Sequence, residues 1–527
     1  MFKVKRTIFV FCILGIAACA LLFIPQVRGL IISFGEQVIT HRKLQAQVWH
    51  EKILLQAIIG AIFFVIVLCS LSSKFKNIIN SFFTLCGKHT LLRYTILLLP
   101  VIFGFIIVTV FGVNVIDWDE WDLALFINGV KEHGIKLQEF FTQHNEHPIF
   151  FPKIVFLLSA LCTHFNTKAN MYISLILNVT IYCTLLNYLR HTLQNKNTQN
   201  RKLAADIFMG FCCFNLIQYG NFLWGFQLAF FMVACFSLLS FYFFYYGCKT
   251  KKTLFFVVAG ISGIISAFSS VQGFFALPVI LFIMALLKIL KENIKLKHFL
   301  CILISFAIVL FLYLLTYRFP SFNNTHYASD LLRSKFLYFF IAQGAPIRIN
   351  LLPPFKIALT AFSGMTVFLT AVLLTIYLIK KKQIQNNIFP LCIIYFGILF
   401  CMAISAGRSV FGLSQALISR YTTFTIQIII GIVLIVTTNS AIWNKNIFKI
   451  PIAKYAILIT TLSILLQNTS IVDVIDYANM KRPMRDVILD YKRQPLEEIA
   501  KSFPWGDLDS AYKYINIVEK KQLVGIL

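Results

Sequence analysis

Acidic side chains crowd into one short segment, residues 117–122, directly after a long apolar run. Its four carboxylates belong to Asp117, Asp119, Glu120 and Asp122. Carboxylates this close repel one another, which raises the pKa of some of them and attracts a divalent cation or a protonated partner. Trp118 and Trp121 lie among them, and tryptophan is typical of the membrane surface, so we expect the carboxylates at headgroup depth. The pattern favours a functional site over a loop whose acids only face solvent.

The segment that follows is expected to return to this acidic cluster. Apolar residues over 123–141 recur at helical spacing, with a break at Gly134, which predicts two short amphipathic helices on the outer membrane surface. These helices would bring residues 144–147 back toward the carboxylates. The candidate substrate-binding groups of this region are Asp122, His144, Glu146 and His147.

A carboxylate at a membrane surface suits the transfer of a sugar from a lipid phosphate. The acceptor hydroxyl must lose its proton as it attacks the anomeric carbon, and a carboxylate within hydrogen-bond reach can take that proton. Asp119 or Glu120 is the candidate base, and Asp117 is a third catalytic candidate. The departing lipid phosphate gains charge, so cations or a metal ion must face it. Asp117 and Asp119 are therefore also the candidate ligands of a divalent cation, Mg²⁺ or Mn²⁺.

A second segment, residues 406–424, supplies positive charge. The charge pattern of the loops places Arg408 and Arg420 outside, where basic residues are not expected, and recognition of phosphate by a guanidinium fork explains them. Anchoring of helix ends at the lipid headgroups is the alternative. Tyr421 follows Arg420, while Trp224 and Gln227 lie in another outer turn and are candidates for stacking on a sugar or hydrogen bonding to it. For that segment we prefer an aromatic turn at the membrane surface over a sugar-binding role on the sequence alone.

The composition indicates what kind of protein must position these residues. The chain has 527 residues, of which 58% are hydrophobic and 13% charged, with a mean hydropathy of +0.78. Soluble domains carry about 25% charged residues, so a soluble protein, a disordered chain and a small disulfide scaffold are all excluded. The apolar runs are long and continuous rather than alternating, which argues against a β-barrel. We therefore expect an all-α polytopic membrane protein.

The positions of lysine and arginine distinguish between the possible membrane topologies. There are fourteen candidate spans, but fourteen crossings would place four basic connectors outside, against the rule that such loops face the cytoplasm. These connectors are residues 190–202, 249–252, 288–297 and 380–382. Omitting the run at 148–166, whose first turns contain two prolines and a lysine, places all four inside. We predict about thirteen spans, with 148–166 partly embedded or re-entrant on the outer side.

This topology divides the chain into three parts. Residues 1–90 are predicted to form an N-terminal membrane hairpin, and residues 91–472 a transmembrane catalytic region whose outer loop is 116–148. Residues 473–527 carry nine acidic and nine basic side chains and are predicted to be a small extracytoplasmic tail. The basic N-terminus is expected in the cytoplasm, so the acidic loop and the tail face outward.

Charge and cysteine content also limit the partners. A net charge of +27 would suggest nucleic acid binding in a soluble protein, but here the basic residues mark membrane loops, so we expect membrane lipids and no nucleic acid. The 13 cysteines lie mostly in apolar runs and contain no CxxC pair, which favours packing over a zinc or redox site. No P-loop, GxGxxG, GxSxG or HExxH motif is present, so nucleotide-driven pumping lacks its usual signature.

At these residues the chain resembles the GT-C superfamily of polytopic membrane glycosyltransferases. The shared pattern is an apolar span, an acidic motif just outside it, amphipathic surface helices, and a His-Pro pair that leads into the next apolar segment. Those elements are here residues 117–122, residues 123–141 and His147-Pro148. The stretches HNEHPIFFPKI, NFLWGFQ and GRSVFGLSQALISRY also look similar to bacterial glucosyltransferase-like membrane proteins that decorate surface polysaccharide, such as lipopolysaccharide O-antigen.

The resemblance implies a function. It is an inverting transfer of a sugar from a polyprenyl-phosphate donor to a cell-surface glycan or a lipid-linked acceptor, with Asp119 or Glu120 as the base. It also implies a bacterial inner (plasma) membrane protein whose active site faces the periplasm. GT-C members usually carry the acidic motif after their first helix, whereas two predicted spans precede it here, so residues 1–90 are expected to be an addition.

Two other functions remain open at the level of the sequence. A flippase or transporter of lipid-linked oligosaccharides needs a polar path through the membrane, and few ionisable residues lie within the predicted spans, Asp206 being the clearest. A polysaccharide polymerase or ligase would also use outer arginines, to hold a lipid pyrophosphate.

Overall fold

The computed structural model describes residues 89–195, 198–292, 294–318, 331–348, 353–444 and 470–495, with a few residues beside these ranges. This part of the chain is almost entirely helical and contains nine segments long and apolar enough to cross a membrane. The prediction of an all-α polytopic membrane protein is thus confirmed. Almost all of the predicted hairpin 1–90, most of the run at 451–472 and most of the tail lie outside the described residues. The total of thirteen spans therefore stays a prediction.

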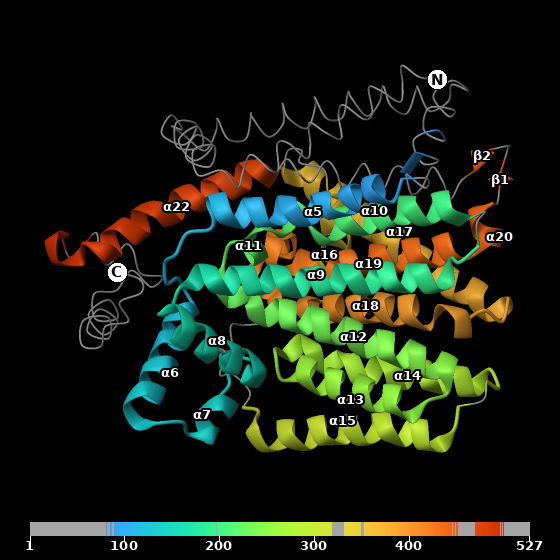
Figure 1. Cartoon of the computed structure of the whole chain (residues 1–527), viewed down its shortest axis with the longest axis horizontal. Coiled ribbons are helices and arrows are strands. Elements are labelled where there is room, and N and C mark those ends of the chain that lie inside the picture. Colours follow the sequence, from blue (N-terminus) through green and yellow to red (C-terminus); the bar gives the residue numbers. More distant parts are fainter. Residues whose placement is uncertain are drawn as a thin grey trace.

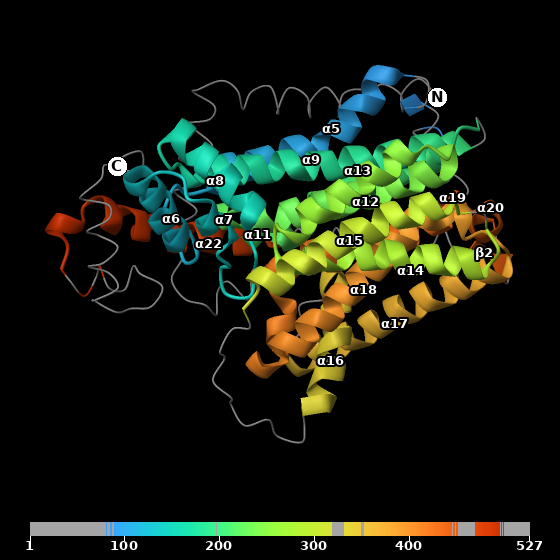
Figure 2. The same ribbon diagram turned by 90° about the horizontal axis from the view of Figure 1, so that it is seen from below.

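The long helices lie side by side in one bundle (Figure 1). Helices are the natural form of these apolar runs, because each backbone N–H and C=O group must find its partner within the segment when water is absent. Figure 2 shows α16 and α17 along one edge of the bundle, next to α18. The helices are α5 (Thr90–Phe111), α9 (Thr167–Thr192), α10 (Gln199–Cys213), α12 (Leu228–Thr250), α13 (Thr253–Ala267), α14 (Ala276–Ile289), α15 (Leu296–Thr316), α16 (Leu331–Gly344), α17 (Pro353–Lys380), α18 (Ile388–Arg408) and α19 (Ser419–Thr438).

Shorter elements gather at the two ends. The end that carries α6, α7 and α8 is called the cavity end here (Figure 1). Its elements are α6 (Glu120–His133), α7 (Leu137–Phe141), α8 (Phe150–Thr163), α11 (Tyr219–Phe222), α22 (Ile471–Leu489), and the 3₁₀ turns η2 (Leu216–Gln218), η3 (Gly225–Gln227), η4 (Val271–Phe275), η5 (Ala345–Ile347), η7 (Ser409–Phe411) and η8 (Leu413–Leu417). The turn η10 (Tyr491–Arg493) follows α22. The other end carries η6 (Gln385–Asn387), α20 (Ser440–Trp443) and the antiparallel strands β1 (Asn446–Ile447) and β2 (Ile450–Pro451).

The basic connectors meet at the end opposite the cavity. A polar recess there is lined by His191 of the first connector, by Lys249 and Lys251 of the second, and by Gln383, which directly follows the last. The charge pattern predicted that these connectors share one side of the membrane, and the fold does bring them together. This end is called the basic end below.

The chain between α5 and α9 stays at the cavity end. The side-chain oxygen of Asn114, just after α5, accepts hydrogen bonds from the backbone N–H (2.8 Å) and the hydroxyl (3.1 Å) of Thr167, the first residue of α9. The segment between them, with α6, α7 and α8, therefore begins and ends at the same place (Figure 1). The 14-residue α8 does not run to the basic end, in agreement with the prediction that 148–166 is not a full crossing.

Candidate functional site

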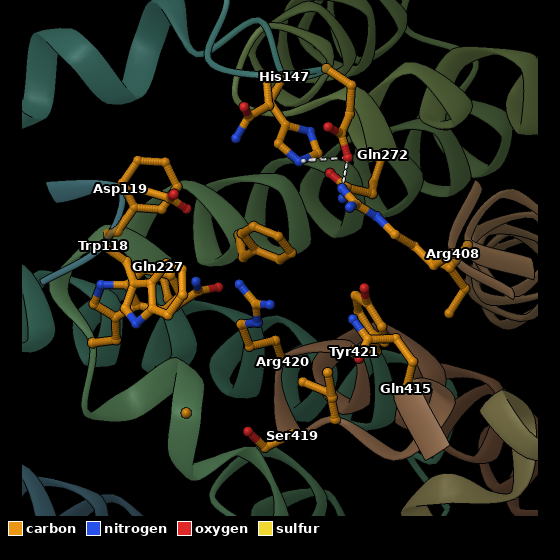
Figure 3. Close-up of a pocket in the computed structure, with 18 of the residues that line it drawn as sticks. Trp118, Asp119, His147, Gln227, Gln272, Arg408, Gln415, Ser419, Arg420 and Tyr421 are labelled. Carbon is orange, nitrogen blue, oxygen red and sulfur yellow. Dashed lines mark hydrogen bonds and ion pairs between the residues drawn. The ribbon is translucent and has the colours of Figure 1, made fainter. Parts of the chain in front are cut away.

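Residues that the sequence singled out meet in one cavity of about 690 Å³ at the cavity end (Figure 3). Its walls come from the loop after α5, the segment before α8, the turns η3, η4 and η8, and the helices α11, α18, α19 and α22. The predicted residues that line it are Asp117, Asp119, Glu146, His147, Trp224, Gln227, Arg408, Arg420 and Tyr421. Three other predicted residues, Glu120, Asp122 and His144, do not line it.

The acidic segment forms a tight turn before α6. Trp118 has a φ of 45°, a left-handed conformation that is uncommon for residues with a Cβ atom and is often found at functional sites. The turn places Asp119 in the cavity wall, across from Arg420 (Figure 3). The carboxylate of Asp119 therefore faces the space in which a substrate would lie.

Glu120 supports this turn from behind. Its side chain is buried, and its Oε2 accepts a hydrogen bond of 3.0 Å from the backbone N–H of Asp117. Burial raises the pKa of Glu120 well above its usual range, against the opposing effect of the backbone N–H groups of Phe226 and Gly225. Glu120 was predicted as a possible base, and the structure places its buried side chain outside the residues that line the cavity.

The side chain of Asp117 is paired. Its Oδ2 forms an ion pair with the Nζ of Lys481 from α22, and both side chains are at least nine-tenths buried. Burial lowers the pKa of Lys481 to about 7. The Asp117 carbonyl also accepts hydrogen bonds from the N–H of Glu120 (3.0 Å) and the indole N–H of Trp224 (3.3 Å). Asp117 thus lies in the cavity wall with its charge already balanced.

His144 holds two of the carboxylates. Its Nε2 lies 3.2 Å from Oδ1 of Asp119, and its Nδ1 lies 3.2 Å from Oδ2 of Asp122. Burial alone would lower the pKa of His144, but the hydrogen bonds and negative charges of these two carboxylates outweigh it and raise the pKa to about 9. His144 and Asp122, predicted to bind substrate, do not line the cavity, and His144 links Asp122 to Asp119.

We expect this arrangement to make stability depend on pH. Because the folded pKa of His144 is higher than the usual 6.5, its pairing stabilises the fold fully below pH 6.5, and the contribution is lost as the pH rises through about 9. We expect the decrease in melting temperature between pH 6.5 and pH 9 to be smaller in His144→Gln than in the wild type. Thermal unfolding of the detergent-solubilised protein at pH 6, 7.5 and 9 measures this. His133→Gln, at an exposed position of α6, should keep the wild-type dependence; an unchanged dependence in His144→Gln would contradict the assignment.

Glu146, His147 and Arg408 form a second network in the cavity wall, and Figure 3 shows His147 and Arg408. Oε1 of Glu146 pairs with the Arg408 guanidinium and lies 3.5 Å from Nε2 of His147. The Nδ1 of His147 lies 3.1 Å from the hydroxyl of Ser270, which in turn donates to Oε1 of Gln272. Burial and the nearby charge of His144 lower the pKa of His147 to about 3, so its imidazole is neutral. Arg408 is thus ion-paired with Glu146, and the neutral His147 adds no charge to the cavity.

Arg420 differs from the other cations of the cavity. Its guanidinium lies 5.3 Å from the ring centre of Trp224, a cation–π contact, and it has no carboxylate partner among the described residues. Gln227 lies close by in Figure 3. Its side chain is fully buried, and neither amide atom has a hydrogen-bond partner in the described part of the chain. An unpaired guanidinium and an unpaired buried amide in one cavity are the groups that a bound ligand would satisfy.

Two glycines allow these walls to come together. A Cβ atom at Gly225 would lie 2.5 Å from Oε1 of Glu120 and 2.7 Å from the carbonyl oxygen of Thr167. At Gly220 it would collide with the hydroxyl of Ser419. These positions let η3 approach the acidic turn and let α11 approach the start of α19, so that Trp224 reaches Arg420.

The described residues do not fit the divalent-cation site that Asp117 and Asp119 suggested. Asp117 is neutralised by Lys481, and Asp119 points one oxygen at His144. No group of three or more His, Cys, Asp or Glu side chains is arranged around a metal position in the part of the chain that the structure describes.

Sequence reasoning missed a whole wall of the cavity. Tyr477 and Met480 of α22 line it, and Lys481 of the same helix pairs with Asp117. The sequence placed this helix in the extracytoplasmic tail and gave no signal that it returns to the site. The cavity is also lined by Tyr219, Gln272, Gln415 and Ser419, polar residues of the turns and helix ends. Their only signal is that each stands at or near the end of an apolar run.

Comparison of the chain with protein-family models, with curated proteins and with solved structures gave no match.

Proposed function

We propose that this protein is an inverting glycosyltransferase of the GT-C type, which transfers a sugar from a polyprenyl-phosphate donor to a cell-surface glycan or a lipid-linked acceptor. The observation that carries the proposal is the meeting of Asp119 and Arg420 in one cavity at the end of a helical membrane bundle. One is a carboxylate that can accept a proton, and the other is a cation free to face a phosphate.

The proposed step is a single displacement. The carboxylate of Asp119 takes the proton of the acceptor hydroxyl while that oxygen attacks the anomeric carbon. The bond from this carbon to the phosphate oxygen breaks, and Arg420 stabilises the negative charge that the departing polyprenyl phosphate acquires. Trp224 holds the guanidinium by the cation–π contact, and Gln227 offers a donor and an acceptor to sugar hydroxyls.

The charge balance of the cavity supports one phosphate rather than two. Lys481 is paired with Asp117, and Arg408 is paired with Glu146. Among the described cavity residues, Arg420 is the arginine without a carboxylate. One free guanidinium fits a phosphate monoester better than the pyrophosphate of a polymerase or ligase donor.

The interior of the helix bundle gives little support to a flippase. Asp206 of α10 is the clearest acid inside a span, and its Oδ2 lies 3.1 Å from the guanidinium of Arg93 in α5. This one ion pair joins two neighbouring helices and by itself outlines no polar path across the described part of the bundle. We therefore favour transfer at one end of the bundle over passage through it.

The test is an assay that separates chemistry from movement. The purified protein is placed in proteoliposomes that contain a panel of polyprenyl-phosphate hexoses labelled in the sugar, with cell-envelope glycan as acceptor. We expect label in the glycan and free polyprenyl phosphate in equal amounts. Movement of the labelled lipid between leaflets without release of polyprenyl phosphate would instead indicate a flippase, and activity only with polyprenyl-pyrophosphate glycans would indicate a ligase.

A further inference from the structure

Helix α22 reaches the site although it is not one of the nine candidate membrane spans among the described residues. It extends from the cavity end of the bundle, next to α5 and α11 (Figure 1). The side chain of Lys481 is only 4% exposed and that of its partner Asp117 only 8%. Such burial of a charge is costly unless the partner stays in place, so α22 and the acidic turn hold each other.

The pair sits at one end of the left-handed turn at Trp118. On the other side of that turn, Asp119 is held by His144. The backbone N–H of Asp117 is bonded to Glu120, and its carbonyl to Trp224, so Lys481 is the group that fixes the Asp117 side chain. A residue with positive φ and a Cβ atom keeps that conformation only when its surroundings hold it on both sides.

We propose that Lys481 is a positioning residue for the transfer reaction: by neutralising Asp117 it holds the Trp118 turn in the conformation that presents Asp119 to the cavity. The inference rests on the proposed function, and it deepens it in two ways. First, it adds α22 to the elements that shape the catalytic centre. Second, it gives the two carboxylates different roles: Asp117 is paired and takes no part in the reaction, and Asp119 acts as the base.

The test is a mutant cycle of Lys481 and Asp117 in the proteoliposome assay. In Lys481→Met the buried Asp117 is left without its cation, so the turn relaxes and Asp119 is displaced. A displacement of about 1 Å lowers a rate about 100-fold, and we expect that loss in kcat with the donor KM changed less than about threefold. Lys481→Arg keeps the charge and should stay within about tenfold of wild type. The double variant Asp117→Asn, Lys481→Met leaves no charge stranded and should be faster than Lys481→Met.

Arg485→Met is the matched control, because Arg485 lies one turn further along α22, is exposed and pairs only with the neighbouring Asp486 among the described residues. It should keep the wild-type kcat. Retention of more than half of kcat in Lys481→Met would overturn the proposal. So would a double variant whose loss equals the product of the two single losses, since independent residues multiply. If Lys481→Met does not fold, a loss of more than about tenfold in Lys481→Arg would overturn it as well.

The same cycle separates this inference from the proposed function. Thermal unfolding of the four proteins is measured without any substrate, and non-additive shifts of melting temperature report the ion pair itself. Wild-type protein that transfers sugar, together with a fully active Lys481→Met, would remove the role of Lys481 and leave the function standing. Wild-type protein that transfers no sugar would remove both, even if the pair stabilises the fold.

Discussion

Replacing Asp119 with asparagine is expected to lower the rate of sugar transfer about 1,000-fold, within the range that a general base contributes. Asparagine has nearly the same shape, and its oxygen can still accept the hydrogen bond from His144, but its amide cannot take a proton from the acceptor hydroxyl. The fold and the donor KM should therefore change little while kcat falls. Initial rates of label transfer in proteoliposomes, with the melting temperature measured on the same samples, test this expectation.

Asp122→Asn is the control for this variant. Asp122 belongs to the same segment and pairs with the same His144, at 3.2 Å, but it does not line the cavity. It undergoes the same chemical change, so effects of altered charge on His144 appear in both variants. We expect a loss below about tenfold for Asp122→Asn. A rate for Asp119→Asn above one tenth of wild type, or a larger loss for Asp122→Asn, would exclude Asp119 as the base.

Replacing Arg420 with glutamine is expected to lower kcat/KM for the donor between about 100-fold and 1,000-fold, the usual cost of removing one group that stabilises developing charge. Glutamine retains hydrogen-bonding capacity but neither the charge nor the planar fork. Arg420→Lys should recover part of the loss, because it restores the charge without the bidentate geometry and with a weaker stack on Trp224. Inhibition by the product polyprenyl phosphate should weaken in parallel, and steady-state kinetics measure both quantities.

Arg485→Gln provides the comparison for Arg420, since it removes a guanidinium from the exposed surface of α22 and leaves the cavity intact. It should transfer sugar at the wild-type rate. The role of Arg420 would be refuted if Arg420→Gln kept its inhibition by polyprenyl phosphate unchanged. Arg408→Gln should also lower the melting temperature, because it leaves the largely buried Glu146 without its cation.

Much of the site was predictable because its residues stand at the ends of apolar runs. A helix that spans the bundle delivers its terminal residues to one of two ends, and the predicted topology put Asp119, Trp224 and Arg420 on the same side, where one cavity holds all three. The sequence did not show that the carboxylates of the acidic segment have different environments. Neighbouring carboxylates differ because one faces the cavity, one faces backbone amides and one faces a lysine from another helix.

The sequence by itself determined the class of the protein and the gathering of the basic connectors at one end. These features are local, since lipid requires each span to satisfy its own backbone and loops carry their charge in the open. Only the tertiary structure decided which cations pair with which carboxylates. Lys481 pairs with Asp117, Arg408 with Glu146, and His144 with Asp119 and Asp122. Arg420 has no carboxylate partner among the described residues. Ion pairing acts over a few ångströms, so it depends on how distant helices pack and leaves no trace in local spacing.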